Sequence, residues 1–214
     1  AYANSQLSKA LDINTLTIGF ARRAATYKRA QLIFKDVDRL IDIGKGKIQI
    51  IFSGKAHPKD EGGKSLIKNI VKSSKYFTGH IKIIYLENYN MWLGRLITSG
   101  VDVWLNTPLR PNEASGTSGM KASLNGVPNL SVLDGWWAEG CIDGVNGWAV
   151  GNPNEISDES DADHLYNLIE NNVIPSYYGD KDDWSTMMKE SIKTGISYTS
   201  HRMVTDYNNQ YYKL

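Results

Sequence analysis

A run of small residues followed by a lysine is the first candidate for chemistry in this chain. The segment EASGTSGMKASLNG, residues 113 to 126, begins at Glu113 and places Lys121 just after a group of glycines and hydroxyl side chains. Small side chains allow successive backbone N–H groups to turn toward one centre, and a helix that follows adds its positive end. The segment therefore predicts a pocket for an anion, with a phosphate group as the natural guest.

Basic residues near the start of the chain extend this hypothesis. The segment ARRAATYKR carries Arg22, Arg23 and Lys28. Arginine offers phosphate oxygens a planar pair of donors, and lysine offers a point charge. The expected ligand is therefore polyanionic, with two phosphate groups rather than one. Taken alone, the basic residues also fit the solvated face of a helix, and the small residues fit a plain strand-to-helix connection.

Two common nucleotide-binding motifs are absent from the sequence. The phosphate loop of nucleotide triphosphatases needs a glycine directly before its lysine and Ser or Thr after it. GMKA around Lys121 has neither, and EGGKS at 61 to 65 has Pro58 where the first glycine should be. Neither segment has the G-x-G-x-x-G spacing of dinucleotide sites.

Lys121 is expected in or near the first turn of the helix that follows the small residues. A cation is unfavourable there, because the helix dipole is positive at that end. The neutral amine is the form that condenses with an aldehyde cofactor such as pyridoxal phosphate to give a Schiff base. Lys121 is therefore a candidate attachment point for such a cofactor.

Strands that alternate with helices must bring these segments together. Apolar runs predict strands at 15–20, 47–54, 81–87, 101–106, 128–134 and 147–151, with helical spacing between most of them and two or three helices at the end. This order predicts an α/β fold with a doubly wound, largely parallel, Rossmann-like sheet. Ligands bind such sheets at the carboxyl ends of the strands, so Arg22, Lys28, Tyr89 and Lys121 are expected along one edge.

Composition narrows the class of protein. The 214 residues suffice for one domain with a sizeable core, and a net charge of +1 argues against a basic coat for nucleic acid. No apolar run reaches the length of a membrane helix, so no membrane is expected. The single cysteine, Cys141, excludes an internal disulfide framework and favours the cytoplasm. The four histidines show no metal-ligand spacing, and no metal is expected.

Five segments in chain order then carry a family resemblance. FARRAATYKRAQLIF, GKAHP, YLENYNMWL, EASGTSGMKASLNG and LDGWWAEG resemble the C-terminal half of the α-glucan (glycogen, starch and maltodextrin) phosphorylases, above all the shorter bacterial and archaeal type. The resemblance implies that residues 1–214 form one cofactor-bearing Rossmann-like domain. That domain would be the C-terminal half of a glycosyltransferase B fold whose N-terminal half is absent from this chain.

The resemblance also implies an activity. In the family, inorganic phosphate attacks the terminal glucose of an α-1,4-glucan and releases glucose 1-phosphate with retained configuration. Pyridoxal phosphate is the cofactor and acts through its phosphate group. The implied partners are the glucan, inorganic phosphate and the N-terminal half of the enzyme, in a cytoplasmic, homo-oligomeric parent protein that binds no nucleic acid.

Matched positions transfer roles to individual residues. Lys121 is implied as the Schiff-base lysine, and Arg23, Lys28 and Gly116 as ligands of the substrate phosphate. The residues implied around the cofactor phosphate are Thr117, Ser118, Arg22 and Tyr89. Those implied for the hydroxyls of the departing glucose are Glu113, Ala114, Ser115 and Gly116. Lys121, Arg23, Lys28 and Glu113 form the implied catalytic set.

The sequence departs from the best-known animal branch of the family at three places. That branch has lysine at the position of Arg22, arginine at that of Asn90, and GTGNMK where this chain reads GTSGMK. These differences bear on the contacts to the cofactor phosphate. The small-residue character of the loop is retained.

Two other functions remain open at this stage. A nucleotide-sugar glucosyltransferase of the glycogen synthase kind shares the fold and a basic edge. A non-catalytic module that binds glucan or phosphate is the second alternative, because half of the expected cleft is absent. The isolated 214 residues are expected to have little or no activity, since both walls of a cleft are needed to orient the sugar and exclude water.

Overall fold

A six-stranded parallel sheet forms the centre of the molecule. The computed structural model describes residues 11–152 and 154–212. Its strands are β1 (Leu16–Ala21), β2 (Ile48–Ser53), β3 (Lys82–Leu86), β4 (Val103–Asn106), β5 (Asn129–Val132) and β6 (Gly147–Val150). They lie in the order β3-β2-β1-β4-β5-β6, and every neighbouring pair is parallel. This is the doubly wound order of dinucleotide-binding folds, and it confirms the predicted fold class.

The strands form where apolar, β-branched runs are buried on both faces. All six residues of β1 and all six of β2 are buried, and they pair in register from Leu16 with Ile48 to Ala21 with Ser53. Continuous apolar runs are typical of parallel strands that helices cover on both sides. The six strands lie within the ranges predicted from the sequence apart from Ala21, which extends β1 by one residue.

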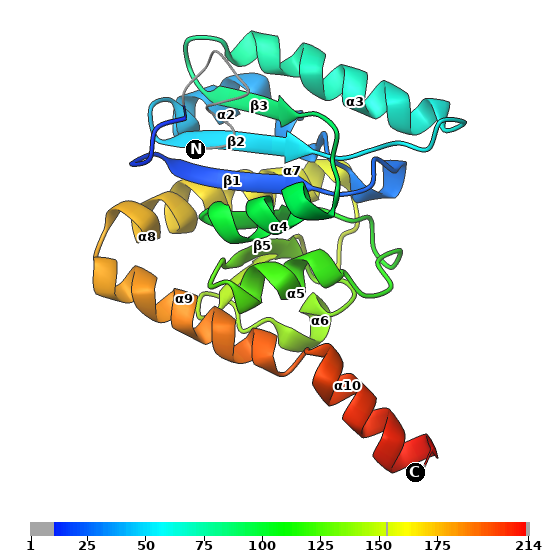
Figure 1. Cartoon of the computed structure of the whole chain (residues 1–214). Helices are drawn as coiled ribbons and strands as arrows, with labels where there is room; N and C mark the ends of the chain where they lie inside the picture. The colour runs from blue at the N-terminus through cyan, green and yellow to red at the C-terminus, as the bar shows by residue number, and fades with distance from the viewer. Residues whose placement is uncertain (1–10, 153, 213–214) are drawn as a thin grey trace.

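Helices cover the two faces of the sheet (Figure 1). Their bounds are α2 (Val37–Gly44), α3 (Glu61–Ser73), α4 (Met91–Gly100), α5 (Thr117–Leu124), α6 (Trp137–Gly140), α7 (Asp158–Leu168), α8 (Ile174–Tyr178), α9 (Lys181–Ile196) and α10 (Ser200–Tyr207). One apolar cluster joins α2, α3 and α7 to one face, with Leu40, Ile70 and Leu165 among its members. A second joins α4 and α5 to the other face through residues such as Leu93 and Ala122.

Short helical turns connect these elements. Three are 3-10 turns: η1 (Thr26–Lys28), η2 (Leu32–Phe34) and η3 (Ser74–Phe77). Two are π-helical turns: η4 (Ile169–Val173), which joins α7 to α8, and η5 (Asn208–Tyr212), which extends α10. After the first strand, the spacing of Ile33, Val37 and Leu40 on one face predicts a single helix. The structure instead has two segments, η2 and α2, which are separated at Asp36. The Asp36 side chain caps α2 by accepting a hydrogen bond from the N–H of Arg39.

The end of the chain differs from the body of the domain. Among the described residues, four α-helices follow β6 in place of the two or three predicted, and α9 packs against α5. Figure 1 shows α10 and η5, in red, pointing away from the sheet. No residue of α10 or η5 is buried. The sequence favours a packing role for the tyrosines of the closing segment YTSHRMVTDYNNQYYKL, within the domain or against the expected N-terminal half. Tyr198, just before α10, packs on Trp136 with ring centroids 5.1 Å apart, whereas Tyr207 and Tyr211 contact each other at 6.0 Å and stay exposed.

No helix in the described ranges combines the length and the apolar character that a membrane crossing requires.

The paired tryptophans Trp136 and Trp137 are buried and pack against each other, with ring centroids 5.1 Å apart. They belong to the core of the domain.

Candidate functional site

The strand order places a crevice between β1 and β4. The connections run in opposite directions from this point, which is where open parallel sheets bind their ligands. Arg22 follows the last residue of β1, and its guanidinium donates to the side-chain oxygen of Asn106, the last residue of β4. Both side chains are buried. The pair closes the floor of the crevice at the carboxyl edge of the sheet.

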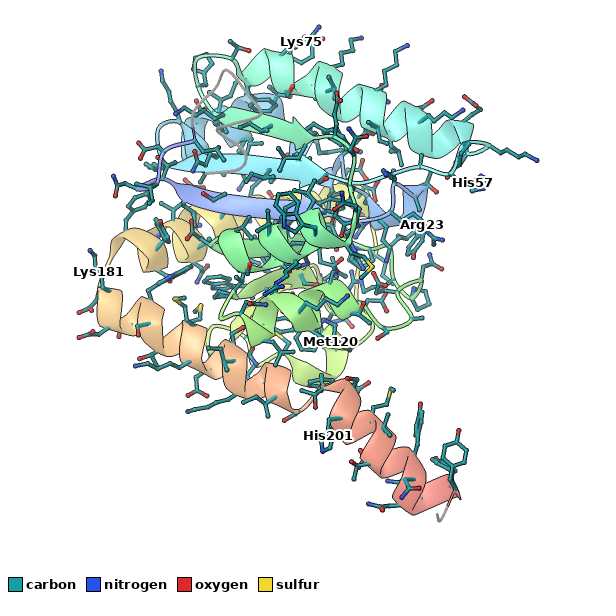
Figure 2. The ribbon with its side chains drawn as sticks, in the orientation of Figure 1. Arg23, His57, Lys75, Met120, Lys181 and His201 are labelled. Carbon is teal, nitrogen blue, oxygen red and sulfur yellow. The ribbon has the colours of Figure 1, made fainter. Side chains whose placement is uncertain are left out.

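One pocket at this edge collects the residues singled out in the sequence. It has a volume of about 400 Å³ and opens to solvent. Its lining residues are Ala21, Arg22, Arg23, Tyr27, Lys28, Tyr89, Glu113, Ala114, Ser115, Gly116, Thr117, Ser118 and Lys121. All eleven sequence-derived site residues are among them. In Figure 2, Arg23 is labelled on the side of the molecule where the strand arrows of Figure 1 end.

Cations dominate the charge of this pocket. Arg22, Arg23, Lys28 and Lys121 contribute four positive charges and Glu113 one negative charge, so the lining carries a formal charge of +3. Arg22 and Lys28 are buried, whereas Arg23 and Lys121 are exposed. An excess of cations in a concave, partly buried site attracts polyanions.

Glu113 lies between two of these cations. A single carboxylate oxygen, Oε2, pairs with Arg22 Nη2 at 2.6 Å and with Lys28 Nζ. Burial raises the pKa of Glu113, but the hydrogen bond from Lys28 and the charge of Arg22 outweigh burial, so the pKa lies below its ordinary value. The carboxylate is thus held ionised. No local pattern indicates these ion pairs, because the partners are 91 and 85 residues apart in the chain.

Tyr27 is a further pocket residue that sequence reasoning missed. The ammonium of Lys28 lies 4.5 Å from the centroid of the Tyr27 ring. Burial opposes ionisation of the phenol, but the hydrogen bond and charge of Lys28 outweigh it and lower the pKa of Tyr27. The signal in the sequence that could have identified Tyr27 as a pocket residue is its position next to Lys28.

The start of α5 supplies unpaired donors to the same pocket. The N-cap residue, Gly116, has a left-handed backbone with φ of 85° and offers no side-chain cap. Thr117 and Ser118 occupy the first two positions of α5, where the helix provides no acceptor for their N–H groups. The Ser118 hydroxyl oxygen is also buried without a hydrogen-bond partner. These donors fit a phosphate group.

The structure corrects the expected position of Lys121. Because α5 begins at Thr117, Lys121 is its fifth residue and lies in its last turn. The helix dipole favours a cation at that end, so the argument that placed Lys121 near the positive end was wrong. The reason is that Gly116, rather than a later Ser or Thr, acts as the N-cap. Lys121 still lines the pocket, and it also borders a second hollow formed by α5 and the start of α10.

Comparison with known proteins identifies the family. Residues 3–140 match the family model described as carbohydrate phosphorylase. The chain belongs to this family. It is 51% identical to the maltodextrin phosphorylase of Thermococcus litoralis over 94% of its own length and 25% of that protein. It is 48% identical to the glycogen phosphorylase of Aquifex aeolicus, over 94% of this chain and 31% of the relative.

A third relative is the glycogen phosphorylase of Mycobacterium tuberculosis, which is 43% identical over 96% of this chain and 25% of its own length. The chain therefore spans between a quarter and a third of these three relatives. Family membership confirms the resemblance read from the five segments. It does not by itself assign roles to residues.

Two further expectations concern Asn90 and the absence of a metal site. Asn90, one of the departures from the animal branch, caps α4 by accepting a hydrogen bond from the N–H of Leu93 at 2.9 Å. Its side chain therefore has a structural task at the helix start. Within the described residues, no group of three or more His, Cys, Asp or Glu side chains gathers as a set of metal ligands.

Proposed function

We propose that this chain is the cofactor-bearing, C-terminal half of an α-1,4-glucan phosphorylase with a glycosyltransferase B fold. The main observation in support is the pocket at the carboxyl edge of β1 and β4. Four cationic side chains and the N-terminus of α5, which has no side-chain cap, meet there. The family match and the names of the relatives support the reaction class. The fraction of each relative that the chain spans supports the existence of a second half.

Pyridoxal phosphate fits the residues of the pocket. The N–H groups of Thr117 and Ser118, the orphaned Ser118 hydroxyl and the Arg22 guanidinium would hold its phosphate, with Tyr89 beside them. Lys121 would attach it, since its side chain lines the pocket and forms no ion pair with any described residue. When bound, the cofactor supplies a phosphate group that exchanges a proton with the substrate phosphate.

The remaining residues bind and orient the substrates. Arg23 and Lys28 would hold inorganic phosphate, with Gly116 allowing the backbone to approach it. Both ion pairs of Glu113 use Oε2, so Oε1 is the atom we assign to hydroxyls of the departing glucose. Ala114 and Ser115 would line the same sugar. Fixed charges around the nucleophile lower the barrier because they need no reorganisation during the reaction.

The other half of the enzyme is required for turnover in this proposal. The pocket is open to solvent, and water competes with phosphate for the glucosyl group unless a second wall closes it. The implied partners are therefore an α-1,4-glucan, inorganic phosphate and the N-terminal half. We also propose that the parent protein is a homo-oligomer of the cytoplasm. The single cysteine of this chain favours that compartment.

The test uses the 214-residue chain and pyridoxal phosphate. After borohydride reduction and proteolysis, mass spectrometry should find the pyridoxyl group on the peptide that contains Lys121. Lys121→Arg, which keeps the charge on an exposed position, should abolish this adduct. Lys72→Arg, on the exposed face of α3, is the matched control and should not.

Two results would contradict the proposal. The first is a label spread evenly over surface lysines and unchanged in Lys121→Arg. The second is an unchanged rate in the longer parent protein that carries Lys121→Ala, when the formation of glucose 1-phosphate from maltodextrin and phosphate is measured. A nucleotide-sugar glucosyltransferase would give the first result, since it has no use for the adduct.

A further inference from the structure

A buried carboxylate outside the pocket joins two loops. One loop carries Lys28 and the other carries Glu113, which form an ion pair in the pocket. Asp161 lies in α7 and is fully buried. Its Oδ2 accepts from Arg29 Nη2 at 2.6 Å, and its Oδ1 accepts from Arg110 Nη2 at 3.0 Å. Arg29 directly follows Lys28, and Arg110 lies three residues before Glu113. One side chain thus connects both segments.

The two loops are also bonded directly to each other. Arg29 donates from Nε to the carbonyl of Thr107 and from Nη2 to that of Pro108, each at 2.9 Å. The Thr107 hydroxyl donates to the carbonyls of Lys28 and Arg29 at 3.2 and 3.1 Å. Every one of these bonds is buried. The geometry of the two loops therefore depends on the orientation of the Arg29 guanidinium.

Asp161 helps to fix that guanidinium, because it accepts a hydrogen bond from Nη2, the atom that also donates to Pro108. Arg29 also pairs with Asp158 at 2.9 Å, but the Asp158 side chain is 50% exposed and so contributes less. Asp161 is fully buried, and its second oxygen is already committed to Arg110. A charge pair in this environment has a narrow range of allowed geometries, because each unpaired orientation would leave a buried charge unsatisfied.

The backbone around Asp161 is shaped to admit this arrangement. Gly151 has φ of 90°, and a Cβ at this position would lie 2.2 Å from Asp161 Oδ1 and 3.1 Å from Arg110 Nη2. A side chain cannot replace the glycine without moving the carboxylate. The pair of arginines on one carboxylate is therefore a specific feature of the fold rather than a surface contact.

We infer that Asp161 is a positioning residue, which sets the distance between Lys28 and Glu113 by clamping Arg29 and Arg110. Asp161 is not among the residues that line the pocket. In describing Lys28 and Glu113 as substrate-binding groups the inference rests on the function proposed above, but the clamp itself does not.

The decisive measurement follows Glu113 rather than overall stability. In the native chain the pKa of Glu113 is below its ordinary value because Lys28 and Arg22 outweigh its burial. Titration of the Glu113 carboxyl by carbon-13 NMR reports directly on how close Lys28 and Arg22 are. In Asp161→Asn this pKa should rise toward the ordinary value. The dissociation constant for inorganic phosphate, measured by calorimetry, should increase about tenfold, as expected when one charge-assisted hydrogen bond to the ligand is weakened.

A matched control lies on the same helix. Asp163 pairs with Arg39 Nη1 at 2.5 Å, and its side chain is 64% exposed. Asp163→Asn removes a carboxylate–arginine pair from α7 without touching the clamp. The pKa of Glu113 and the phosphate affinity should both stay at the native values.

A second variant covers the case in which Asp161→Asn does not fold. The double variant Asp161→Leu with Arg110→Met removes the buried carboxylate together with one of its two arginine partners, which proteins tolerate better than the loss of the carboxylate alone. It too should raise the pKa of Glu113 and weaken phosphate binding. If either folded variant keeps both native values, the inference is overturned. The pyridoxyl adduct on Lys121 tests the proposed function separately. If the adduct still forms in these variants, the proposed function stands even where the inference about Asp161 fails.

Discussion

Replacing Glu113 with glutamine should destabilise the chain by a predictable amount. The Glu113 side chain is 6% exposed and compensates two cations, Arg22 and Lys28, whose side chains are 7% and 8% exposed. Removing one partner of a buried charge pair costs about 3 to 5 kcal/mol, because the remaining charge is left unsatisfied. The pocket admits solvent to the cations, so we expect the lower end, about 3 kcal/mol. For a domain of this size that corresponds to a fall in Tm of roughly 6 to 12 °C.

The effect should depend on pH in a defined direction. The pKa of Glu113 in the folded chain is lowered, so its stabilising contribution is fully present above the ordinary glutamate value of about 4.3 and is lost as the pH falls through the folded value. Below that value the native side chain is protonated and resembles glutamine. The difference between native chain and Glu113→Gln should therefore shrink as the pH is lowered from about 5.

Urea unfolding followed by circular dichroism at several pH values measures both quantities. Glu190→Gln is the control, since Glu190 pairs with Lys193 on the surface of α9 and its loss should cost no more than about 0.5 kcal/mol. Added inorganic phosphate should raise the Tm of Glu113→Gln more than that of the native chain, because the freed cations bind an oxyanion. A loss below about 1 kcal/mol at pH 7, or stability curves that run parallel down to acid pH, would refute the reasoning.

Further predictions concern a glycine, a thiol and a buried hydroxyl. Gly116→Ala should lower the free energy of unfolding by about 1 to 2 kcal/mol in urea melts, because φ is 85° and the new Cβ would lie 3.2 Å from the Trp136 ring. Gly46→Ala, with φ of 71° and no atom within 4 Å of its Cβ, should lose less, and an equal loss would contradict the steric part of the argument. Burial and the charge of Asp143 raise the pKa of Cys141 to about 12, so iodoacetamide should alkylate it far more slowly at pH 8 than glutathione, as followed by mass spectrometry. Ser118→Ala should leave the Tm nearly unchanged or raise it, since the hydroxyl oxygen has no partner, while weakening pyridoxal phosphate retention; a clear fall in Tm would show that the hydroxyl has a structural partner.

The sheet was predictable from the sequence because its signals are local. Runs such as KIQIIFSG combine β-branched residues with a closing glycine, and that pattern alone predicts a buried strand. The strand ends then identified Arg22 and Lys28 as neighbours of the later segments. Topology supplied this conclusion, since all parallel strands end at the same edge.

The details of the site depend on contacts that no local pattern encodes. The sequence suggested a later start for the helix that carries Lys121, since Ser and Thr favour the N-cap, whereas the left-handed backbone of Gly116 begins it at Thr117. Likewise, no local pattern distinguishes Asp161 from Asp158 and Glu159, the other acidic residues in the first turn of α7. Its full burial against two arginines follows only from the packing of α7 beneath the loops.

The order of the strands also governs which parts of this chain can change. Loops that leave the carboxyl ends of β1, β3 and β4 supply the pocket, whereas the loops at the opposite ends of the strands contribute none of its lining residues. Substitutions at those opposite ends can alter folding and association while the lining of the pocket stays the same. Conversely, exchange of a few residues after β4 changes the lining of the pocket and leaves the sheet as it is, so the two ends of the strands can vary independently.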